Sequence, residues 1–345
     1  MVHPAVSRLM HKDDRQRRRA VRRLFDLDDP ESLVGFVPLL GDDDPWFRGK
    51  AMEAIRKWLD ESQGGLVKML AYSEYSEQRV LAAKYAHFWS DEVTLLAQLS
   101  NDRDRSVRLA AWNSRLAASD EDIAVLIEMA MKNDDDEIRR VAVGKIGMVP
   151  EMNLGLLKMG LTDPSPRVVE TAVKFVSRHP EFGEHSEIAD LVIGIARGIG
   201  GPLRGAAVQV IAPNSLENSV IAELILELVG EESVILVSSL CSGLREIEWW
   251  MVEGLADRLV STASDSLVAR LLRGERSQKV VPIRDAILSD QNKSVVLKSR
   301  IVEDMIGRPV DDSTAKIVSF LAESEDESLS AISKILLAEI ESATS

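Results

Sequence analysis

Reactive side chains are few in this sequence, and their spacing matches no catalytic or metal-binding pattern. It has five histidines and a single cysteine, Cys241. His179 and His185 flank a proline-containing turn without the further ligands that zinc requires, and the acidic turns 42–44 and 133–136 lack the spacing of a calcium loop. A glycine-rich phosphate loop, a nucleophile elbow and an HExxH helix are missing from the sequence. We therefore predict a protein that is not an enzyme and that uses no metal or cofactor.

Basic residues concentrate in the first 25 residues, which hold eight arginines and lysines against two aspartates. Such a block can contact nucleic acid, an anionic lipid surface or an acidic protein segment. It can equally be a polar end that keeps the protein soluble. No Trp or Tyr accompanies it, which disfavours stacking on single-stranded bases. Both interpretations stay open, and the candidate contact residues are Arg15, Arg18, Arg19 and Arg22.

Three more candidates lie where a polar or aromatic residue interrupts an apolar pattern. Arg115 occupies a position that is otherwise apolar in equivalent segments, and a buried guanidinium needs a partner or a route to solvent. It is either an arginine stacked on an aromatic ring such as Trp112, or a polar anchor in a binding groove. Trp249 and Trp250 are adjacent. Trp249 either packs in a core or serves as an exposed aromatic anchor for a partner.

The sequence contains a repeated pattern. It consists of an aspartate, an apolar residue three positions later, an arginine directly after it, and an alanine three positions further on. Asp44, Phe47, Arg48 and Ala51 form one copy, and residues 104–111 and 135–142 form others. We call the alanine position the anchor. The anchors are at 20, 51, 82, 111, 142, 172 and 207, with weaker echoes at Ser238, Leu271, Ser299 and Ser333. The spacing predicts about eleven units of about 31 residues.

Each unit is predicted to form two short helices. In one unit the helices cover about 31–40 and 44–59, with Asp44 as N-cap and Pro45 at the first helical position, where its missing N–H is not needed. Apolar residues recur at intervals of three and four, the helical period. No segment alternates apolar and polar residues as a half-buried strand would.

The Asp…Val/Ile-Arg…Ala motif resembles HEAT-like repeats, specifically the short variety described in phycobilisome lyases. The resemblance is strong over residues 13–207 and weak up to 341. It implies an all-α, armadillo-like α-solenoid, a right-handed α-α superhelix in which each helix pair buries its apolar face against the next. The family includes scaffolds, adaptors, chromophore lyases and a DNA-glycosylase branch, so the resemblance says little about function.

The arginine three residues before the anchor forms a column at 17, 48, 79, 108, 139 and 204, whereas the last four units have Ile235, Val268, Val296 and Ser330. Aspartate N-caps and acid–base pairs four residues apart would stabilise each helix, and each arginine could also reach an aspartate of the neighbouring unit. Alternatively, the column is a basic ridge for an acidic ligand, which the aspartates would largely neutralise. The predicted ladder residues are Asp44, Arg48, Arg79, Asp104, Arg108, Asp135, Arg139 and Arg204.

We expect one solenoid over residues 1–345: a basic cap region at 1–30, regular repeats at 31–214, and degenerate, more acidic repeats with a C-terminal cap at 215–345. The formal net charge is −14, which argues against a general nucleic-acid binder because such affinity depends on neutralising phosphates. No secretory signal or apolar membrane span is evident in the sequence, so a cytoplasmic location is expected.

The composition and the repeats favour a non-enzymatic scaffold or adaptor that binds an unidentified protein partner along the concave surface lined by the second helices. The alternative is a nucleic-acid-binding protein of the DNA-glycosylase-like branch, using the basic first helix and the arginine column. A chromophore lyase is suggested by the family name alone. Homodimerisation through the C-terminal repeats is a further possibility that the sequence leaves open.

Overall fold

Helices joined by short turns make up the described chain. The computed structural model describes residues 3–118, 122–150, 153–179, 185–198 and 201–344, and none of these residues lies in a β-strand. The all-α prediction is therefore confirmed for this part of the chain. The chain divides into two compact units, Met1–Pro150 and Glu151–Ser345. The division falls inside segment 31–214, which the sequence pattern groups as regular repeats.

The first unit is a series of helix pairs, each with a first helix and a second helix. The second helices are α1 (Asp14–Leu27), α3 (Pro45–Trp58), α5 (Ser76–Lys84), α7 (Arg105–Ala118) and α9 (Asp136–Val143). The first helices are η1 (Val6–Met10), α2 (Leu33–Phe36), α4 (Gly64–Ala71), α6 (Glu92–Leu99) and α8 (Ile123–Met131). Short 3₁₀ turns accompany them: η2 (Pro30–Ser32), η3 (Val37–Gly41), η4 (Glu61–Gln63), η5 (Ala86–Phe88) and η6 (Ile146–Met148).

The predicted helix over residues 31–40 is divided into a single α-turn, α2, between the 3₁₀ turns η2 and η3. Pro38 lies near the start of η3. A proline has no N–H to donate to the carbonyl four residues earlier, so the regular α-helical hydrogen bonding cannot continue through it.

The second unit repeats the arrangement. Its second helices are α11 (Pro166–Arg178), α14 (Gly201–Ile211), α16 (Val234–Leu244), α18 (Asp265–Leu272), α20 (Val295–Met305) and α22 (Glu327–Thr344). Its first helices are α10 (Leu154–Leu161), α13 (Ser186–Ala196), α15 (Ser219–Leu228), α17 (Leu255–Ser261), α19 (Val281–Ser289) and α21 (Asp312–Leu321). Three 3₁₀ turns complete it: η7 (Ala212–Leu216), η8 (Trp249–Met251) and η9 (Gln278–Val280).

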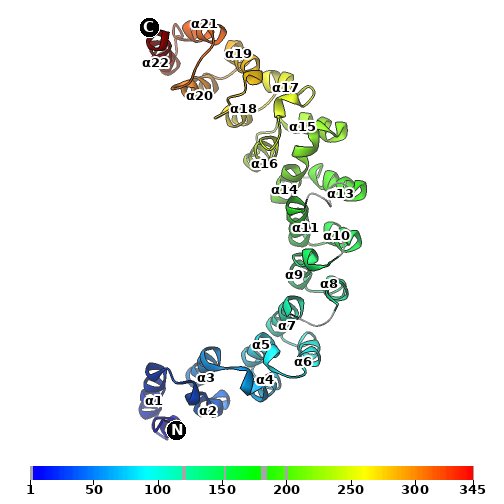
Figure 1. The fold of residues 1–345 in the computed structure, drawn as a ribbon, viewed down its shortest axis with the longest axis vertical. Helices are drawn as coiled ribbons and strands as arrows, with labels where there is room; N and C mark the ends of the chain where they lie inside the picture. The colour runs from blue at the N-terminus through cyan, green and yellow to red at the C-terminus, as the bar shows by residue number, and fades with distance from the viewer. Residues whose placement is uncertain (1–2, 119–121, 151–152, 180–184, 199–200, 345) are drawn as a thin grey trace. The chain divides into compact units, whose positions relative to one another are not determined.

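Within each unit the helices lie in two rows, one of first helices and one of second helices (Figure 1). A second helix packs against its own first helix and against the second helices on either side, as α14 packs against α13, α11 and α16. Contacts of this kind, between neighbouring repeats only, are the defining property of a stacked repeat protein.

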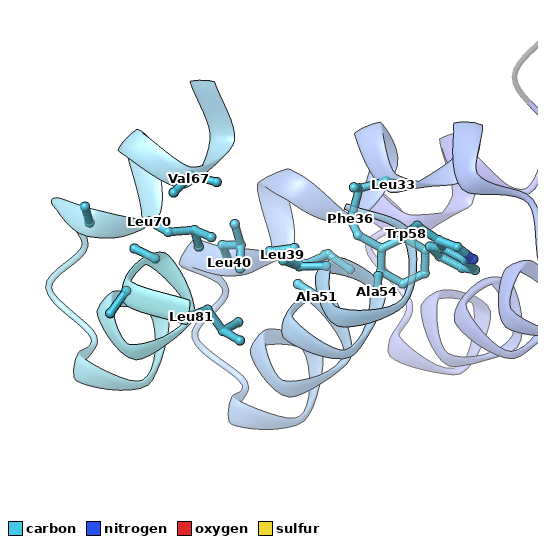
Figure 2. Packing of buried hydrophobic residues seen from close by; sticks show 14 of the residues in the cluster. Leu33, Phe36, Leu39, Leu40, Ala51, Ala54, Trp58, Val67, Leu70 and Leu81 are labelled. Atoms are coloured by element: carbon cyan, nitrogen blue, oxygen red, sulfur yellow. The ribbon is translucent and has the colours of Figure 1, made fainter. Parts of the chain in front are cut away.

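The anchor alanines lie in the buried core between the helices. All seven are buried, Ala20 at 3% exposure and the other six at 0%. Because alanine has the smallest apolar side chain, it lets two helices approach closely. Figure 2 shows Ala51 of α3 beside Leu39 and Leu40 of η3, with Leu70 and Leu81 of the following pair in the same apolar layer. The core therefore continues from one repeat to the next within the unit.

The last four repeats keep the pattern's length but change its residues. Their buried anchors are Leu240, Leu271, Ile301 and Ser333, each four residues after a buried leucine: Leu236, Leu267, Leu297 and Leu329. The predicted anchors at Ser238 and Ser299 are wrong by two residues, since Ser238 is exposed and Ser299 only half-buried. The arginine-column positions in these repeats are correspondingly Val237, Val268, Lys298 and Ser330.

Serine replaces aspartate before the second helices in three of these repeats. Ser233, Ser264 and Ser294 are the N-caps of α16, α18 and α20. The hydroxyl of Ser264 accepts from the backbone N–H of Leu267, and that of Ser294 from Leu297. A serine oxygen suits this role as well as a carboxylate does, because either can accept from an N–H group at the start of a helix.

Candidate functional site

The basic surface of the first repeat is the most exposed group of candidate residues. The carboxylate of Asp13 accepts from the backbone N–H of Arg15 and so begins α1. The apolar residues Ala20, Val21 and Leu24 of this helix are buried. Its remaining face carries exposed arginines, which together with Arg8 of η1 we call the first-repeat basic surface: Arg8, Arg15, Arg19, Arg22 and Arg23.

These five arginines have no charged partner among the residues that the structure describes. None of their side chains forms an ion pair or hydrogen bond with another residue in the described part of the chain. Arg8, Arg19 and Arg23 also line a hollow of about 360 Å³ beside His3 and Gln16. The surface thus presents several free guanidinium groups, which suit the recognition of carboxylates or phosphates.

Arg17 and Arg18 lie on the same helix but bind the next repeat. Arg17 donates to the backbone carbonyl of Leu9 over 3.0 Å, pairs with Asp42, and lies over the ring of Phe47. Arg18 pairs with Asp44 at 3.1 Å and lies 4.5 Å from the ring centroid of Trp46. Of the four predicted contact residues on this helix, Arg18 is therefore engaged, and Arg15, Arg19 and Arg22 have no partner within the described ranges.

Four arginines of the column, Arg48, Arg79, Arg108 and Arg139, close the turn before their second helix. Nη1 of Arg48 donates to the carbonyls of Asp42 and Asp43 at 2.7 and 3.1 Å. The same Nη1 bonds to the carbonyls six and five residues earlier recur in Arg79, Arg108 and Arg139. Arg48 and Arg108 donate to these carbonyls rather than to the carboxylate four residues before.

Some column arginines also bind an acid of the following repeat. Arg79 donates to both carboxylate oxygens of Asp102 at 2.7 and 2.9 Å. Arg204 binds Glu231 in the same two-bond manner at 2.8 Å. Arg48 instead lies 4.4 Å from the ring centroid of Tyr75. The column therefore joins neighbouring repeats, but through different partners in each.

The aspartates divide into two positions with different roles. Asp44, Asp104 and Asp135 each accept from the backbone N–H two residues later, which caps the second helix. Two residues earlier, Asp42, Asp102 and the amide oxygen of Asn133 accept from the backbone N–H of the capping aspartate. Sequence reasoning missed this second position, although the Asp-x-Asp spacing marks it. It supplies the carboxylates that Arg17 and Arg79 bind across the repeats.

Hydrogen bonds lower the pKa values of three carboxylates in these turns, Asp102, Asp104 and Asp135. The bond from Arg79 holds the pKa of Asp102 below its ordinary value, against the opposing effect of burial. Ser106 lowers the pKa of Asp104 in the same way. Arg105, a residue outside the predicted ladder, binds Asp135 at 2.5 and 2.8 Å and lowers the pKa of that carboxyl. All three groups are therefore stabilised in the charged form.

The structure corrects three of the candidate contact residues. Trp249 lies on the 3₁₀ turn η8 at 1% exposure, so its interpretation as an exposed anchor is wrong. Trp112 and Arg115 of α7 are 5% and 4% exposed, and the guanidinium lies 4.7 Å from the indole centroid. Both side chains are covered, so they form a stacked pair in the interior and are not open to a partner.

The remaining reactive groups offer no site. Cys241 is buried, and burial raises the pKa of its thiol, which keeps it protonated and unreactive. Among the described residues, no three His, Cys, Asp or Glu side chains are grouped so that they could hold a metal ion. Within the same residues, no helix combines the length and apolar character of a membrane span.

Comparison with solved structures places the chain in a fold but not in a family. The chain is similar to yeast importin-β with a TM-score of 0.50 and 16% identity, over 98% of this chain and 53% of the importin-β chain. It thus spans about half the length of that protein. It is also similar to Escherichia coli YibA, at a TM-score of 0.32 and 16% identity, over 81% of this chain and 93% of YibA.

No protein-family model matches the sequence, and no curated protein matches it either. The likeness to importin-β shows that the helix pairs form a HEAT-like helical solenoid fold.

Proposed function

We propose that this protein is a non-enzymatic scaffold whose row of second helices binds a partner protein, and that the first-repeat basic surface engages an acidic segment of that partner. The five exposed arginines without charged partners are the observation that carries the proposal. The helical-solenoid fold supports it, because stacked repeats present a long surface made of equivalent positions.

The charge of the surrounding chain favours an acidic protein segment over nucleic acid. The net charge of −14 disfavours a long polyanion, which must approach many residues at once. A short acidic segment meets only the local positive charge, because salt screens charges more than about 10 Å away. Nucleic acid, bound in the manner of the DNA-glycosylase-like branch, is therefore the alternative to be tested.

The test is fluorescence anisotropy with a labelled Glu/Asp-rich peptide and with duplex DNA at about 50 mM salt, where electrostatic affinity is large. The variant R15Q/R19Q/R22Q/R23Q removes four of the five arginines of the first-repeat basic surface, and R103Q/R167Q/R197Q/R258Q removes the same charge from exposed arginines elsewhere. We expect the peptide to bind the wild type and the control, and to bind the first variant at least tenfold more weakly.

Two results would overturn the proposal: no peptide binding by the wild type, or equal weakening by both variants. Tighter binding of DNA than of the peptide would favour the nucleic-acid alternative. Affinity capture from the native extract then identifies the partner, as a protein retained by the wild type and the control but lost with the first variant.

Several finer features stay proposals. They are the right-handed superhelix, the count of about eleven repeats, the kinship with phycobilisome-lyase-type repeats, the cytoplasmic location, and homodimerisation through the C-terminal repeats. Light scattering of the purified protein tests the last of these directly, since a dimer doubles the mass of 38.1 kDa.

A further inference from the structure

A cluster of arginines lies in the second unit, far along the sequence from the first-repeat basic surface. Arg270 on α18 and Arg300 on α20 stand directly before the anchors Leu271 and Ile301, so they occupy the same place in successive repeats. Arg273 follows α18, and Arg284 lies on α19. Together these side chains line one hollow of about 550 Å³ between α18 and α20.

Most of the positive charge in this hollow is uncompensated. In the described part of the chain, the side chains of Arg270, Arg273 and Arg300 have no ion pair or hydrogen bond. Arg284 is half-buried and donates to the backbone carbonyl of Glu275 at 3.2 Å. Because a carbonyl carries no net charge, this contact does not balance the charge of Arg284.

The acids that line the same hollow do not neutralise it. Asp304 accepts from Arg308 at 3.0 and 3.1 Å and from the backbone N–H of Gly274 at 2.9 Å, so its charge is already matched. Glu303 is the other acidic residue of the lining. The guanidinium groups of Arg270, Arg273 and Arg300 therefore face one remaining carboxylate of the lining, while Arg284 also lies near Asp304, Asp285 and Glu275.

We propose that this hollow, the Arg270–Arg300 pocket, is a binding site for a phosphate group, either inorganic phosphate or a phosphate monoester. A carboxylate carries one charge and is satisfied by a single guanidinium in a two-bond pair. A phosphate monoester carries nearly two charges and three acceptor oxygens at neutral pH, so it matches several arginines at once. The volume lies within the range of small-molecule sites, which leaves room for the group that bears the phosphate.

The surrounding charge argues for a small or single phosphate rather than a nucleic acid. Residues 151–345 hold 19 basic and 30 acidic residues, so a long polyanion is repelled by most of this unit. One phosphate group inside the pocket lies among the arginines, and a Debye length of about 10 Å screens it from the acids beyond. The source is therefore either free phosphate or a phosphorylated small molecule or side chain.

This inference does not rest on the proposed function, because the pocket shares no residue with the first-repeat basic surface. The test uses the full-length protein, with inorganic phosphate and N-acetylphosphotyrosine amide as probes and N-acetyltyrosine amide as the uncharged comparison. Calorimetric titrations compare the wild type with R270Q/R300Q and with the control R197Q/R258Q, which removes the same charge from exposed arginines of the same unit. Circular dichroism confirms that each variant is folded.

We expect at least one phosphate probe to bind the wild type and the control, and its dissociation constant to rise at least tenfold in R270Q/R300Q. Binding of inorganic phosphate alone identifies free phosphate as the source, and binding of both probes identifies a phosphorylated molecule. The proposal is refuted if neither probe binds up to about 10 mM, a concentration that would detect even millimolar affinity. It is equally refuted if the control weakens binding as much as R270Q/R300Q does.

Discussion

Replacing Arg79 by methionine tests whether the arginine column stabilises contacts between repeats as well as the turns. Arg79 and Arg48 each donate through Nη1 to two carbonyls of their own turn. Arg79 additionally binds Asp102 of the next repeat, with side-chain exposures of 7% for Arg79 and 12% for Asp102. The variants R79M and R48M therefore lose the same local bonds, and only R79M loses an ion pair between repeats.

The ion pair sets the expected difference between the two variants. Loss of two hydrogen bonds from a charged donor costs about 1–3 kcal/mol, which we expect for R48M. Removing one partner of a buried ion pair costs about 3–5 kcal/mol, because the other charge is left unpaired. We therefore expect R79M to lower the free energy of unfolding by about 2 kcal/mol more than R48M does.

Native-state hydrogen exchange is the appropriate assay, because stacked repeats can unfold in stages and a single unfolding free energy is then poorly defined. In R79M the amides of α5 and α7 should exchange faster than the corresponding amides around α3 do in R48M. The double variant R79M/D102N should recover part of the loss, since it leaves no unpaired charge. Equal losses in R79M and R48M would refute the reasoning.

The pH dependence gives the same prediction a second readout. Because Arg79 lowers the folded-state pKa of Asp102, the unfolded state binds the proton more readily. The stability that comes from the pair is thus fully present above the unfolded value of about 3.9 and is lost as the pH falls through the folded pKa. The difference between wild type and R79M should be constant near neutral pH and shrink below about pH 4.

Two further predictions concern the second unit. A Cβ on Gly243 would meet the Cβ of Ala212 at 2.7 Å and the carbonyl oxygen of Gln209 at 2.8 Å. The variant G243A should therefore have a free energy of unfolding that is lower by about 1–3 kcal/mol. Nothing lies within 4 Å of a Cβ on Gly194, so G194A should raise the free energy of unfolding by about 0.5–1 kcal/mol. If the thermal unfolding midpoints of the two variants shift in the same direction, this prediction is contradicted. The variant S294A removes the side-chain cap of α20 and should lower the free energy of unfolding by about 1 kcal/mol. In contrast, S299A should leave the unfolding midpoint unchanged. A larger loss of stability in S299A than in S294A would show that the corrected register is wrong.

The sequence predicts most of this fold because the early repeats carry a strong signal. Six of the seven anchor alanines are fixed by an arginine three residues before them and, in four repeats, by an aspartate four residues earlier still. The late repeats lose the arginine and keep a leucine, such as Leu297, and in three of them a serine, such as Ser294, takes the place of the aspartate. Leucine and serine are common in any helical protein, so the register there could not be fixed to better than two residues.

The candidate sites are less predictable because burial and pairing depend on the folded chain. Arg15 and Arg18 look alike in the sequence, but only Arg18 meets Asp44 and Trp46 of the next repeat. The covered position of Trp249 depends on the 3₁₀ turn η8, for which the sequence has no clear signal. Arg270 and Arg300 are 30 residues apart, and that relation becomes visible only when the anchors at Leu271 and Ile301 are known.

The turn that precedes each second helix has a consequence for how such a chain can change in length. Before α3, α7 and α9 the turn combines an acceptor two residues before the cap, the cap itself and the column arginine, and these groups recur in phase. A duplicated segment that begins and ends at equivalent anchors would restore these groups at both new junctions. An insertion of any other length would break the hydrogen bonds of a turn. The chain can therefore grow or shrink by whole modules, and we expect engineered duplications of one complete module to fold.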